Sequence, residues 1–585
     1  MGGDFELDEV STTPHFGDAM SQAESSKTQT KTGERVAIRD RILAVVSRRG
    51  ENVWIVDANT GREITYGVFH RRACALAAEL RRRGARKGDR VAVMVPNCVE
   101  LAIFYFACIY LGAVIVPIHP ALGNGEVEFI LSSCKPRLIV TSAACADAIK
   151  GLHHGALRLM TAQEAVSEAE APDQIRISAL TEALDFAPLE DVCGEDLAVI
   201  MYTSGTSAKP KGLAHKLGRM FRNASAFASA QGIDQDSRFY LTLSMSYMGG
   251  LYNLLLLPFL CGASVVVDHV FDARSSLHFW EKARNNRVNT LWLAPTVLSI
   301  LLRMDRGRTG EEFCRSSVRS AFVGFAPLPL KVKEEFESRY GVRLIENYGL
   351  SETLFVTAGS PLDRFQDPSS APGYVGEALP GIGLRIVGDD QEQAGDGIDG
   401  EIEILAPDLM AGYLDAEGRV SEIDAATWFP TGDVGHLDPR GSLFVTGRKK
   451  DLIIRGGVNI SPAAIEDALM HVPGIADVAV VSIPHELYGE DIVAVLKLDN
   501  GVDLESILEL VLAHAKRTLA QHQQPARYIA IDEFPRTASG KVQKARIREL
   551  VAEKLHVGAT STSFSLKDST LSRPTRATES AGVSR

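Results

Sequence analysis

Apolar runs of strand length alternate with apolar runs of helix length along most of the chain, and this alternation limits the folds available to it. In residues 89–118, "DRVAVMV" and "AVIVPI" have the β-branched composition of buried strands, and "NCVELAIFYFACIYLG" between them has the length of a helix. Two parallel neighbouring strands need a crossover connection, which is usually a helix. The sequence therefore predicts an α/β fold with mainly parallel sheets.

Two apolar runs are long enough to be considered as membrane spans, residues 101–118 and 251–267. Gly112 divides the first run into a helix-length piece and a strand-like piece, and asparagine, proline and glycine interrupt the second. A buried helix that leads into a buried strand explains both runs. We therefore expect no membrane span.

The chain has 585 residues, which is too many for one domain. Residues 1–35 and 557–585 are rich in small polar residues and predict disordered tails. Residues 36–449 form the expected large domain, and the short strands and glycines toward its end predict a β-rich subdomain. Residues 450–556 predict a small α+β domain, in which Ser461–Pro462 are the N-cap and first residue of a helix.

Composition argues against some classes of partner and compartment. The formal net charge of −12 disfavours nucleic acid, because neutralising phosphates requires a basic face. Eight cysteines are scattered without a C-x-x-C pair, which favours buried free thiols in a reducing compartment over disulfides or zinc sites. The opening "MGGDFELDEV" lacks the apolar core of a secretory signal. These features predict a cytoplasmic protein, either a monomer or a homodimer.

The stretch 202–213, "YTSGTSAKPKGL", is the first candidate for a binding site. It follows "EDLAVIM", which has the composition of a buried strand, and such a loop can present several N–H and O–H donors to one anion. It lacks the G-x-x-x-x-G-K-[ST] pattern of a P-loop, so a kinase-like or ATPase reading is disfavoured. On its own, the stretch is either a phosphate-binding loop or a flexible surface turn.

Four further blocks follow in a fixed order and change that interpretation. They are "NYGLSE" (347–352), "WFPTGD" (428–433), "GRKKDLIIRGGVNISP" (447–462) and "PRTASGK" (535–541). Together with the loop, they resemble the motifs of the adenylate-forming (ANL) superfamily, which includes acyl- and aryl-CoA synthetases, luciferases and adenylation domains. The resemblance extends over roughly residues 45 to 550.

The resemblance implies a two-step reaction and a large lobe with a small, mobile C-terminal domain. A carboxylate first attacks the α-phosphate of ATP, which gives acyl-AMP and pyrophosphate. The thiol of CoA, or of a carrier-protein phosphopantetheine, then captures the acyl group. Mg²⁺ is expected beside the phosphates, because a hard cation between phosphate oxygens needs a carboxylate ligand.

The resemblance also assigns ATP-binding roles to individual residues. The β- and γ-phosphates are expected to contact Thr203, Ser204, Gly205, Thr206, Ser207 and Lys211. The adenosine side is expected to contact Ala326 in the segment 324–327, Asn347, Tyr348 and Gly349, with Asp433 at the ribose hydroxyls and Arg448 at the ribose or phosphate. Ser351 is expected to donate to the α-phosphate, and Glu352 and Thr206 are expected to bind Mg²⁺.

The catalytic assignment centres on Lys541, with Glu352 and Ser351. The attacking carboxylate and the α-phosphate are both anionic, so a lysine between them would stabilise the charge-rich transition state. By resemblance, Lys450 is the hinge about which the small domain turns between the two steps. Gly456 and Gly457 are expected to line the passage for the pantetheine arm.

Three positions depart from the commonest pattern of the superfamily. Ala208 replaces a loop glycine, Phe325 stands where glycine or alanine is common, and Tyr247 stands where many acyl and aryl ligases have histidine. Amino-acid-activating relatives usually have aspartate at the position of Tyr247, so an amino-acid substrate is disfavoured. The expected acyl pocket is apolar or aromatic and favours an aryl or medium-chain acid; its residues are Tyr247, Gly249, Phe325 and Leu350.

Four classes of function remain open from the sequence. A carboxylate–CoA ligase is the leading hypothesis. An acyl-AMP ligase that loads a carrier protein fits the same residues, and a luciferase-like oxygenase would use the same adenylation step. A non-catalytic binding relative is disfavoured, because Lys541, Glu352 and Asp433 are all present.

Overall fold

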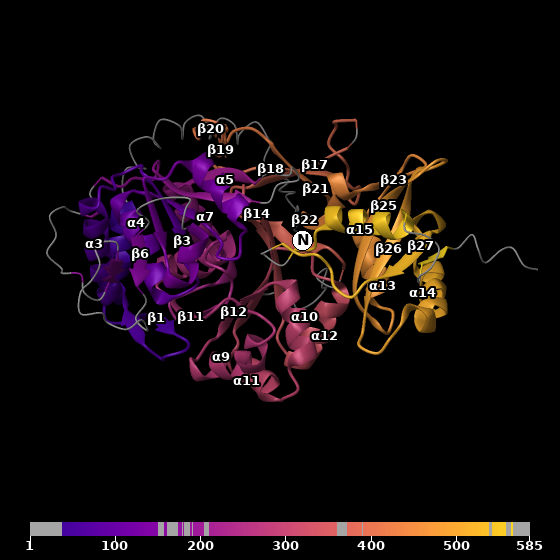
Figure 1. Ribbon diagram of the computed structural model, residues 1–585, viewed down its shortest axis with the longest axis horizontal. Helices are drawn as coiled ribbons and strands as arrows, with labels where there is room; N and C mark the ends of the chain where they lie inside the picture. Colours follow the sequence, from indigo (N-terminus) through magenta and orange to yellow (C-terminus); the bar gives the residue numbers. More distant parts are fainter. Residues whose placement is uncertain are drawn as a thin grey trace, which may run out of the picture.

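The computed structural model describes residues 38–149, 157–160, 174–177, 180, 188–189, 191–203, 210–359, 371–388, 390–537, 541–556 and 563–565. The body of the molecule contains two large sheets with helices around them, and the C-terminal elements form a separate unit beside it (Figure 1). The architecture confirms the predicted α/β fold.

The larger sheet is parallel in one half and antiparallel in the other. Its parallel strands, in spatial order, are β14 (Leu344–Leu350), β13 (Ser320–Val323), β12 (Thr290–Leu293), β10 (Arg238–Leu241), β11 (Ser264–Val267) and β1 (Val53–Asp57), with β2 (Glu63–Thr65) antiparallel at the edge. Beyond β14 the antiparallel strands are β15 (Leu354–Ala358), β16 (Tyr374–Ala378), β22 (Ser442–Arg448), β21 (Phe429–Leu437), β18 (Gly400–Leu405) and β17 (Gly383–Val387). The predicted β-rich region is therefore the continuation of a parallel sheet.

The second sheet is parallel through its centre. Its strands, in order, are β20 (Val420–Glu422), β19 (Gly412–Leu414), β9 (Lys211–Lys216), β8 (Leu197–Thr203), β4 (Val114–Pro117), β3 (Arg90–Met94), β5 (Leu138–Thr141), β6 (Leu157–Met160) and β7 (Gln174–Arg176). The pairs β8–β9, β9–β19 and β19–β20 are antiparallel. The strand β9 thus lies between β8 and β19, which are about two hundred positions apart in the sequence.

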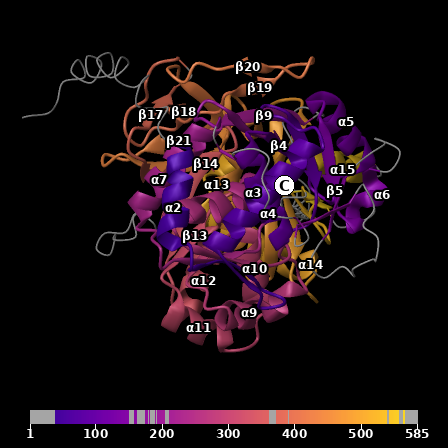
Figure 2. The same ribbon diagram turned by 90° about the vertical axis from the view of Figure 1, so that its left-hand side faces the viewer.

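Helices cover these sheets and fill the space between them. They are α2 (Ile38–Arg49), α3 (Tyr66–Arg82), α4 (Val99–Leu111), α5 (Asn124–Cys134), α6 (Ala146–Ile149), α7 (Leu217–Gln231), α8 (Leu257–Cys261), α9 (Phe279–Asn285), α10 (Pro295–Met304), α11 (Thr309–Ser317) and α12 (Leu330–Tyr340). Figure 2 looks onto the side of the body where α2, α3 and α4 gather.

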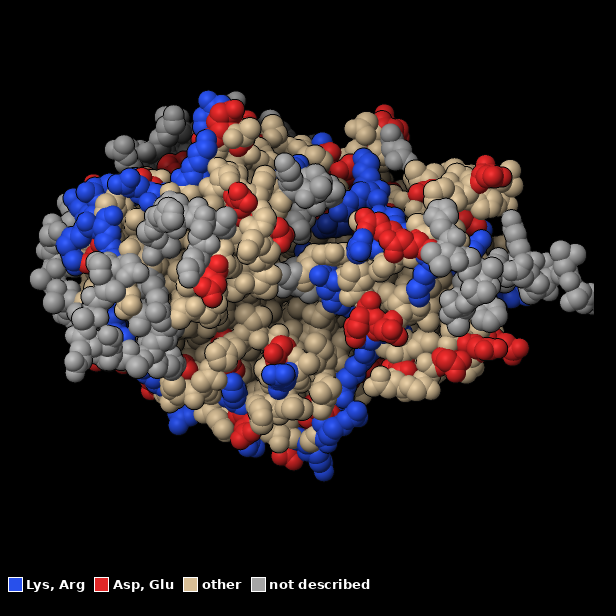
Figure 3. All heavy atoms as spheres, in the orientation of Figure 1, with Lys and Arg blue, Asp and Glu red and all other residues tan. Residues whose placement is uncertain are grey.

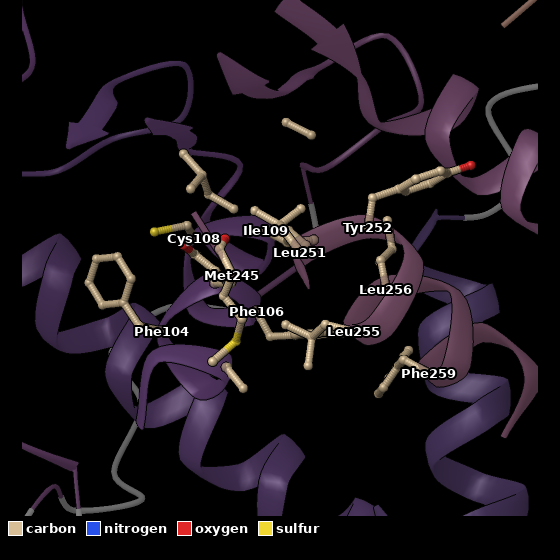
Figure 4. Packing of buried hydrophobic residues seen from close by; sticks show 14 of the residues in the cluster. Phe104, Phe106, Cys108, Ile109, Met245, Leu251, Tyr252, Leu255, Leu256 and Phe259 are labelled. Atoms are coloured by element: carbon tan, nitrogen blue, oxygen red, sulfur yellow. Dashed lines mark hydrogen bonds between the residues drawn. The ribbon is translucent and has the colours of Figure 1, made fainter. Parts of the chain in front are cut away.

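The helix α4 explains the apolar run 101–118. Every residue of α4 is buried, and the helix contacts β4 of one sheet and β1 of the other. Gly112 ends it in the left-handed region (φ 71°), which glycine adopts without strain, and β4 follows. The second run contains the π-helix η3 (Gly249–Leu256), whose Leu251 and Leu255 lie against α4 (Figure 4). Within the described residues, no helix is both long and apolar enough to cross a membrane.

The C-terminal unit has its own sheet and its own apolar core (Figure 1). Its strands are β24 (Val458–Ile460), β23 (Ile453–Arg455), β26 (Gly489–Leu498), β27 (Arg527–Ala530) and β28 (Ser563–Ser565), with β25 (Ile475–His485) on β26; its helices are α13 (Pro462–Met470), α14 (Leu504–Thr518) and α15 (Lys544–His556).

Two details of this unit differ from the expectation. The sequence predicts a disordered tail over 557–585, whereas residues 563–565 within it form β28, because their backbone pairs with the edge strand β27. Ser461 and Pro462 do begin α13, but the Ser461 hydroxyl does not cap the helix. It donates instead to the carbonyl of Thr446.

Candidate active site

Two hairpin tips carry the first two sequence motifs. The strands β8 and β9 pair through Thr203 and Lys211, so the expected phosphate loop is the tip of this hairpin. Ser204, Gly205, Thr206, Ser207 and Ala208 lie outside the described residues. The strands β14 and β15 pair through Leu350 and Leu354, which leaves Ser351, Glu352 and Thr353 at the second tip.

Tight backbone packing forms the second tip. A Cβ at Gly349 would lie 2.0 Å from the carbonyl oxygen of Leu354, so only glycine fits there. The backbone N–H of Leu350 donates to Thr353 Oγ1 (3.0 Å), and Leu354 has a positive φ of 60°. The "YGLSE" sequence thus folds into a sharp turn that presents Ser351 and Glu352.

Three contacts hold this turn against β9, β19 and the segment just before β19. His215 of β9 donates through Nε2 to the carbonyl of Ser351 (2.6 Å), and Tyr413 of β19 donates through its hydroxyl to Glu352 Oε1 (3.0 Å). The backbone N–H of Met410 donates to the carbonyl of Glu352 (2.8 Å). The strand that leaves the phosphate loop therefore also fixes the position of Ser351 and Glu352.

His215 and Tyr413 are both held uncharged. His215 is fully buried, and burial lowers its pKa to about 4. Burial, together with the charge of Glu352, raises the pKa of Tyr413 above its usual value. The Nζ of Lys211 lies 5.7 Å above the ring of Tyr413, within range of a cation–π contact.

The residues expected at the nucleoside are brought together at the end of β14. Asp433 of β21 is buried and accepts hydrogen bonds from the Tyr348 hydroxyl (2.8 Å to Oδ2) and from Arg448 Nε (2.8 Å to Oδ1). Asn347 donates to the carbonyl of Val323 (2.9 Å). The two hydrogen bonds to Asp433 orient its carboxylate. Each carboxylate oxygen has a second lone pair, which can still accept a hydrogen bond from a ligand hydroxyl.

The segment after β13 lies against Asn347 on one side. A Cβ at Gly324 would lie 2.8 Å from Asn347 Oδ1, so glycine is required for this approach. Ala326 is exposed. The ring of Tyr348 is largely buried and belongs to an apolar cluster with residues of β18 and β22, so little of it remains open to a ligand.

Lys541 reaches this region from the C-terminal unit. Its loop is closed by two hydrogen bonds, from Thr537 N–H to the Lys541 carbonyl (2.8 Å) and from Lys541 N–H to Thr537 Oγ1 (3.1 Å). Part of its surface is open to solvent, yet burial lowers its pKa, with Arg448 acting in the same direction and Asp433 and Glu352 in the opposite one. The predicted catalytic lysine therefore lies within electrostatic range of three predicted site residues.

Other basic side chains gather along the junction between the body and the C-terminal unit (Figure 3). Lys450 lies in the short 3₁₀ turn Lys449–Asp451, directly between β22 and β23. Burial, the largest cause, and Arg448 lower its pKa. An exposed turn between the two units is the position expected of a hinge.

Gly456 and Gly457 form the two-residue turn of the β23–β24 hairpin. Arg455 pairs with Val458, and both glycines have positive φ, 60° and 84°. Such turns require positive φ at both central residues, which explains the pair of glycines. The two glycines therefore lie at the end of a hairpin of the C-terminal sheet.

The residues expected around the acyl group come from three segments. Phe325 has a positive φ of 75°, and its ring lies so close to Gly249 that a Cβ there would be 2.9 Å from Phe325 Cε1. Tyr247 precedes η3, and its ring is stacked on His119, with centroids 5.1 Å apart. Leu350 is half-buried at the end of β14. Tyr247, Gly249 and Phe325 are thus brought together.

One carboxylate is available for a metal ion near the phosphate loop. Glu352 Oε1 accepts from Tyr413, and Glu352 forms no ion pair within the described residues. In the same part of the chain, no cluster of three or more metal-ligating side chains exists. A single carboxylate suits Mg²⁺ bound mainly through substrate phosphates, so the residues present fit this ion.

The sequence motifs did not reveal His119, His215 and Tyr413. His215 and Ser351 are 136 positions apart, and Tyr413 and Glu352 are 61 apart. The strands that carry His215 and Tyr413, β9 and β19, pair with each other across the sequence, and no local pattern encodes this pairing.

Comparisons with known proteins agree with this geometry. The model of the family described as AMP-binding enzyme matches residues 42–414, and that of the AMP-binding enzyme C-terminal domain matches residues 464–541. Indoleacetate–CoA ligase of Aromatoleum aromaticum is 33% identical over 500 residues, which cover 84% of this chain and 94% of that relative. Medium-chain fatty-acid–CoA ligase of Escherichia coli is 28% identical, with coverage of 86% and 88%.

A solved structure has a fold similar to that of this chain. The crystal structure of ATP-bound MatB from Rhodopseudomonas palustris superimposes with a TM-score of 0.75 at 27% identity, and the match covers 88% of this chain and 99% of that chain. The similarity extends over both the body and the C-terminal unit.

Proposed function

The chain belongs to the AMP-binding enzyme family as an ATP-dependent acid–thiol ligase, and we propose that it activates an aryl or medium-chain carboxylic acid for transfer to CoA. The observation that supports this most strongly is the position of Lys541 near Glu352, Asp433 and Arg448. These four residues come from two units and four motifs, which supports a site where charges from both units meet.

In the first step, the substrate carboxylate attacks the α-phosphorus of ATP and pyrophosphate leaves. Both reactants are anionic, so the barrier contains a large electrostatic term. Lys541 supplies positive charge between them, and Ser351 donates to the α-phosphate from the turn that His215 holds. Mg²⁺, bound through Glu352 and Thr206, would neutralise charge on the phosphates.

The nucleoside is held by the neighbouring group of residues. Asp433 accepts the ribose hydroxyls and stays oriented because Tyr348 and Arg448 bind its two oxygens. Asn347 and the segment at Ala326 contact the adenine. The residues of the β8–β9 tip, with Lys211, hold the pyrophosphate that leaves.

In the second step, the CoA thiol attacks the acyl-AMP carbonyl and AMP leaves. Lys450 lies between the two units and acts as the hinge that removes Lys541 from the site. Gly456 and Gly457 then line the path of the pantetheine arm, where larger side chains would block it.

The substrate class follows from Tyr247, Gly249, Phe325 and Leu350. Tyr247 offers no carboxylate to an α-amino group, which disfavours amino acids. Aromatic and apolar side chains suit an aryl or medium-chain acid. The printed names of two relatives, an indoleacetate–CoA ligase and a medium-chain fatty-acid–CoA ligase, agree with these two classes.

Loading of a carrier-protein phosphopantetheine is the second candidate, since the thiol is the same chemical group. A luciferase-like oxygenase is disfavoured, because the relatives named above are CoA ligases. A thiol-competition assay with free CoA and a phosphopantetheinylated carrier protein separates the first two. We expect free CoA to be the better acceptor.

The decisive experiment is a pyrophosphate-release screen across aryl, short, medium and long carboxylic acids and amino acids. We expect release with aryl or medium-chain acids, followed by thioester formation when CoA is added. A response to amino acids alone would contradict the assignment of Tyr247.

A further inference from the structure

Glu401 lies between the expected ribose site and the expected hinge. It belongs to β18, which lies with β21 and β22 near the junction of the body and the C-terminal unit (Figure 1). Its Oε2 accepts a hydrogen bond from Lys449 Nζ (2.6 Å), and its Oε1 accepts one from the backbone N–H of Gly432 (3.3 Å). One carboxylate therefore contacts both the first residue of the turn Lys449–Asp451 and the residue that precedes Asp433.

The part of β21 that carries Asp433 is a bulge held against β18. Glu401 and Glu403 are separated by one residue, whereas their partners on β21 are separated by three, and Asp433 is one of these three. Bulges redirect side chains and are common next to active sites. Thr431 Oγ1 donates to the carbonyl of Ile402 (2.7 Å) and accepts from the N–H of Asp433 (3.0 Å). The Thr431 hydroxyl and the Glu401 carboxylate thus both fasten the bulge to β18.

The 3₁₀ turn between the two units is tied to a different unit at each end. Lys449 pairs with Glu401 of the body (2.6 Å), and Arg548 of α15 in the C-terminal unit pairs with Asp451 Oδ1 (3.3 Å). Lys450, the expected hinge, is the residue between them. The two ion pairs therefore constrain the turn from both sides.

The helix that contacts this turn also follows Lys541. The first residue of α15 is Lys544, which comes three positions after Lys541. Lys544 Nζ pairs with Glu466 Oε1 of α13 (2.7 Å), and α15 packs against β25. The orientation of α15 relative to the turn therefore determines where Lys541 lies relative to the body. A series of contacts thus leads from the β21 bulge through Glu401, the turn and Arg548 to Lys541.

The two partners of the body-side ion pair differ in exposure. The side chain of Glu401 is 17% exposed and that of Lys449 is 55% exposed. The carboxylate has a backbone N–H as its second partner, so it is already oriented where the lysine meets it. Exposed ion pairs contribute little to stability, so loss of this pair should change a rate only a few-fold. Reversal of one charge should have a larger effect, because like charges repel.

We propose that Glu401 is a positioning residue for adenylation, which couples the bulge that carries Asp433 to the turn about which the C-terminal unit moves. The inference rests on the proposed function, because the turn acts as a hinge only if the enzyme alternates between two arrangements. With Glu401 in place, the arrangement that holds the ribose also holds Lys541 at the reacting groups. Without it, the turn is less constrained and this arrangement is less populated.

The test uses the sign of one substitution in two backgrounds. Glu401→Gln keeps an acceptor for Gly432 but removes the charge that faces Lys449, so adenylation should fall about 3-fold, as for the loss of an exposed ion pair. Lys449→Glu brings a like charge against Glu401 and should lower adenylation about 10-fold. Adding Glu401→Gln to Lys449→Glu removes this repulsion, so in that background the same substitution should raise adenylation.

The measurement follows the two half-reactions separately. Single-turnover pyrophosphate release, with the acid that reacts fastest in the screen, reports on adenylation, and conversion of the supplied acyl-AMP to thioester reports on the second step. The second step should keep its wild-type rate in every variant, because it does not need this arrangement. Glu403→Gln is the matched control, since it removes a carboxylate two positions along β18 that pairs with Arg385 (2.6 Å). It should keep both rates.

Calorimetric titration with ATP tests the ribose end of this coupling without the acid. Glu401→Ala removes the acceptor of the Gly432 N–H and loosens the bulge, so it should bind ATP about 5-fold more weakly, as for the loss of one hydrogen bond. Glu401→Gln keeps an acceptor and should bind ATP as the wild type does.

Three results would overturn the inference. They are a further fall in adenylation when Glu401→Gln is added to Lys449→Glu, equal losses in both half-reactions, and wild-type ATP affinity in Glu401→Ala. Pyrophosphate release by the wild type from none of the acids screened would instead contradict the proposed function, and the ATP titration would still decide whether Glu401 supports the ribose site.

Discussion

Asp467 of the C-terminal unit caps the first turn of a helix in the body: its Oδ1 accepts a hydrogen bond from the backbone N–H of Leu330 (3.1 Å), the first residue of α12. The N-cap residue of α12 is Pro329, whose side chain cannot accept this bond. In the other direction, Lys331 Nζ donates to the carbonyl of Met470 (2.9 Å), the last residue of α13. Two helices from different units therefore cap each other's ends.

We expect Asp467→Ala to weaken adenylation selectively. The reciprocal caps favour the arrangement that brings Lys541 to the site, and losing a cap of about 1 kcal/mol should lower adenylation roughly 5-fold. Conversion of supplied acyl-AMP to thioester should not fall, because that step does not need this arrangement. Pre-steady-state assays of the two half-reactions give the measurement.

Asp467→Asn is the matched control, since asparagine also accepts hydrogen bonds at helix N-termini. It should retain most of the adenylation rate. Equal losses in Asn and Ala variants, or equal losses in both half-reactions, would contradict a role for this contact in domain placement.

Substitution of Lys541 should separate the two half-reactions more sharply. The Lys541→Ala enzyme lacks the charge that approaches Glu352 and Asp433, so adenylation should fall at least about 100-fold. Thioester formation from supplied acyl-AMP should continue. Lys516→Ala removes an exposed lysine of α14 and should leave both rates at wild-type values. Parallel loss of both steps in Lys541→Ala would show that the lysine acts on more than adenylation.

Local patterns in the sequence predicted the elements and the motif residues, because both are encoded within a few neighbouring positions. The helix α4 and strand β4 follow from their apolar runs and Gly112. The contacts of Asp467, His215 and Tyr413 depend on partners far along the chain. Ser461 shows the same limit, since a distant carbonyl competes successfully for its hydroxyl.

Tyr413→Phe should weaken the affinity of the enzyme for Mg²⁺ without unfolding it. The Tyr413 hydroxyl orients Glu352 through a 3.0 Å hydrogen bond, and such partners of a metal ligand typically change affinity by 10-fold or more. The Mg²⁺ concentration at half-maximal adenylation should therefore rise by about 10-fold, with a smaller change in kcat at saturating Mg²⁺. Tyr488→Phe, at an exposed tyrosine of the C-terminal unit, is the control. If the Mg²⁺ requirement is unchanged, Tyr413 does not position the ligand.

His215 should make the stability of the body depend on pH. Its folded pKa is about 4 and its ordinary value is 6.5, so between these values the unfolded chain binds a proton that the folded chain does not. Stability is therefore full above about pH 6.5 and falls as the pH decreases toward 4, by about 3 kcal/mol in total for this group.

The four tryptophans lie in residues 54–428, so their fluorescence during urea denaturation reports on the body. His215→Gln keeps an N–H for the Ser351 carbonyl and cannot titrate, so its denaturation midpoint should vary less with pH than that of the wild type. Identical pH profiles for the two proteins would mean that the pKa of His215 is the same in the folded and the unfolded chain, which would contradict the expected effect of burial.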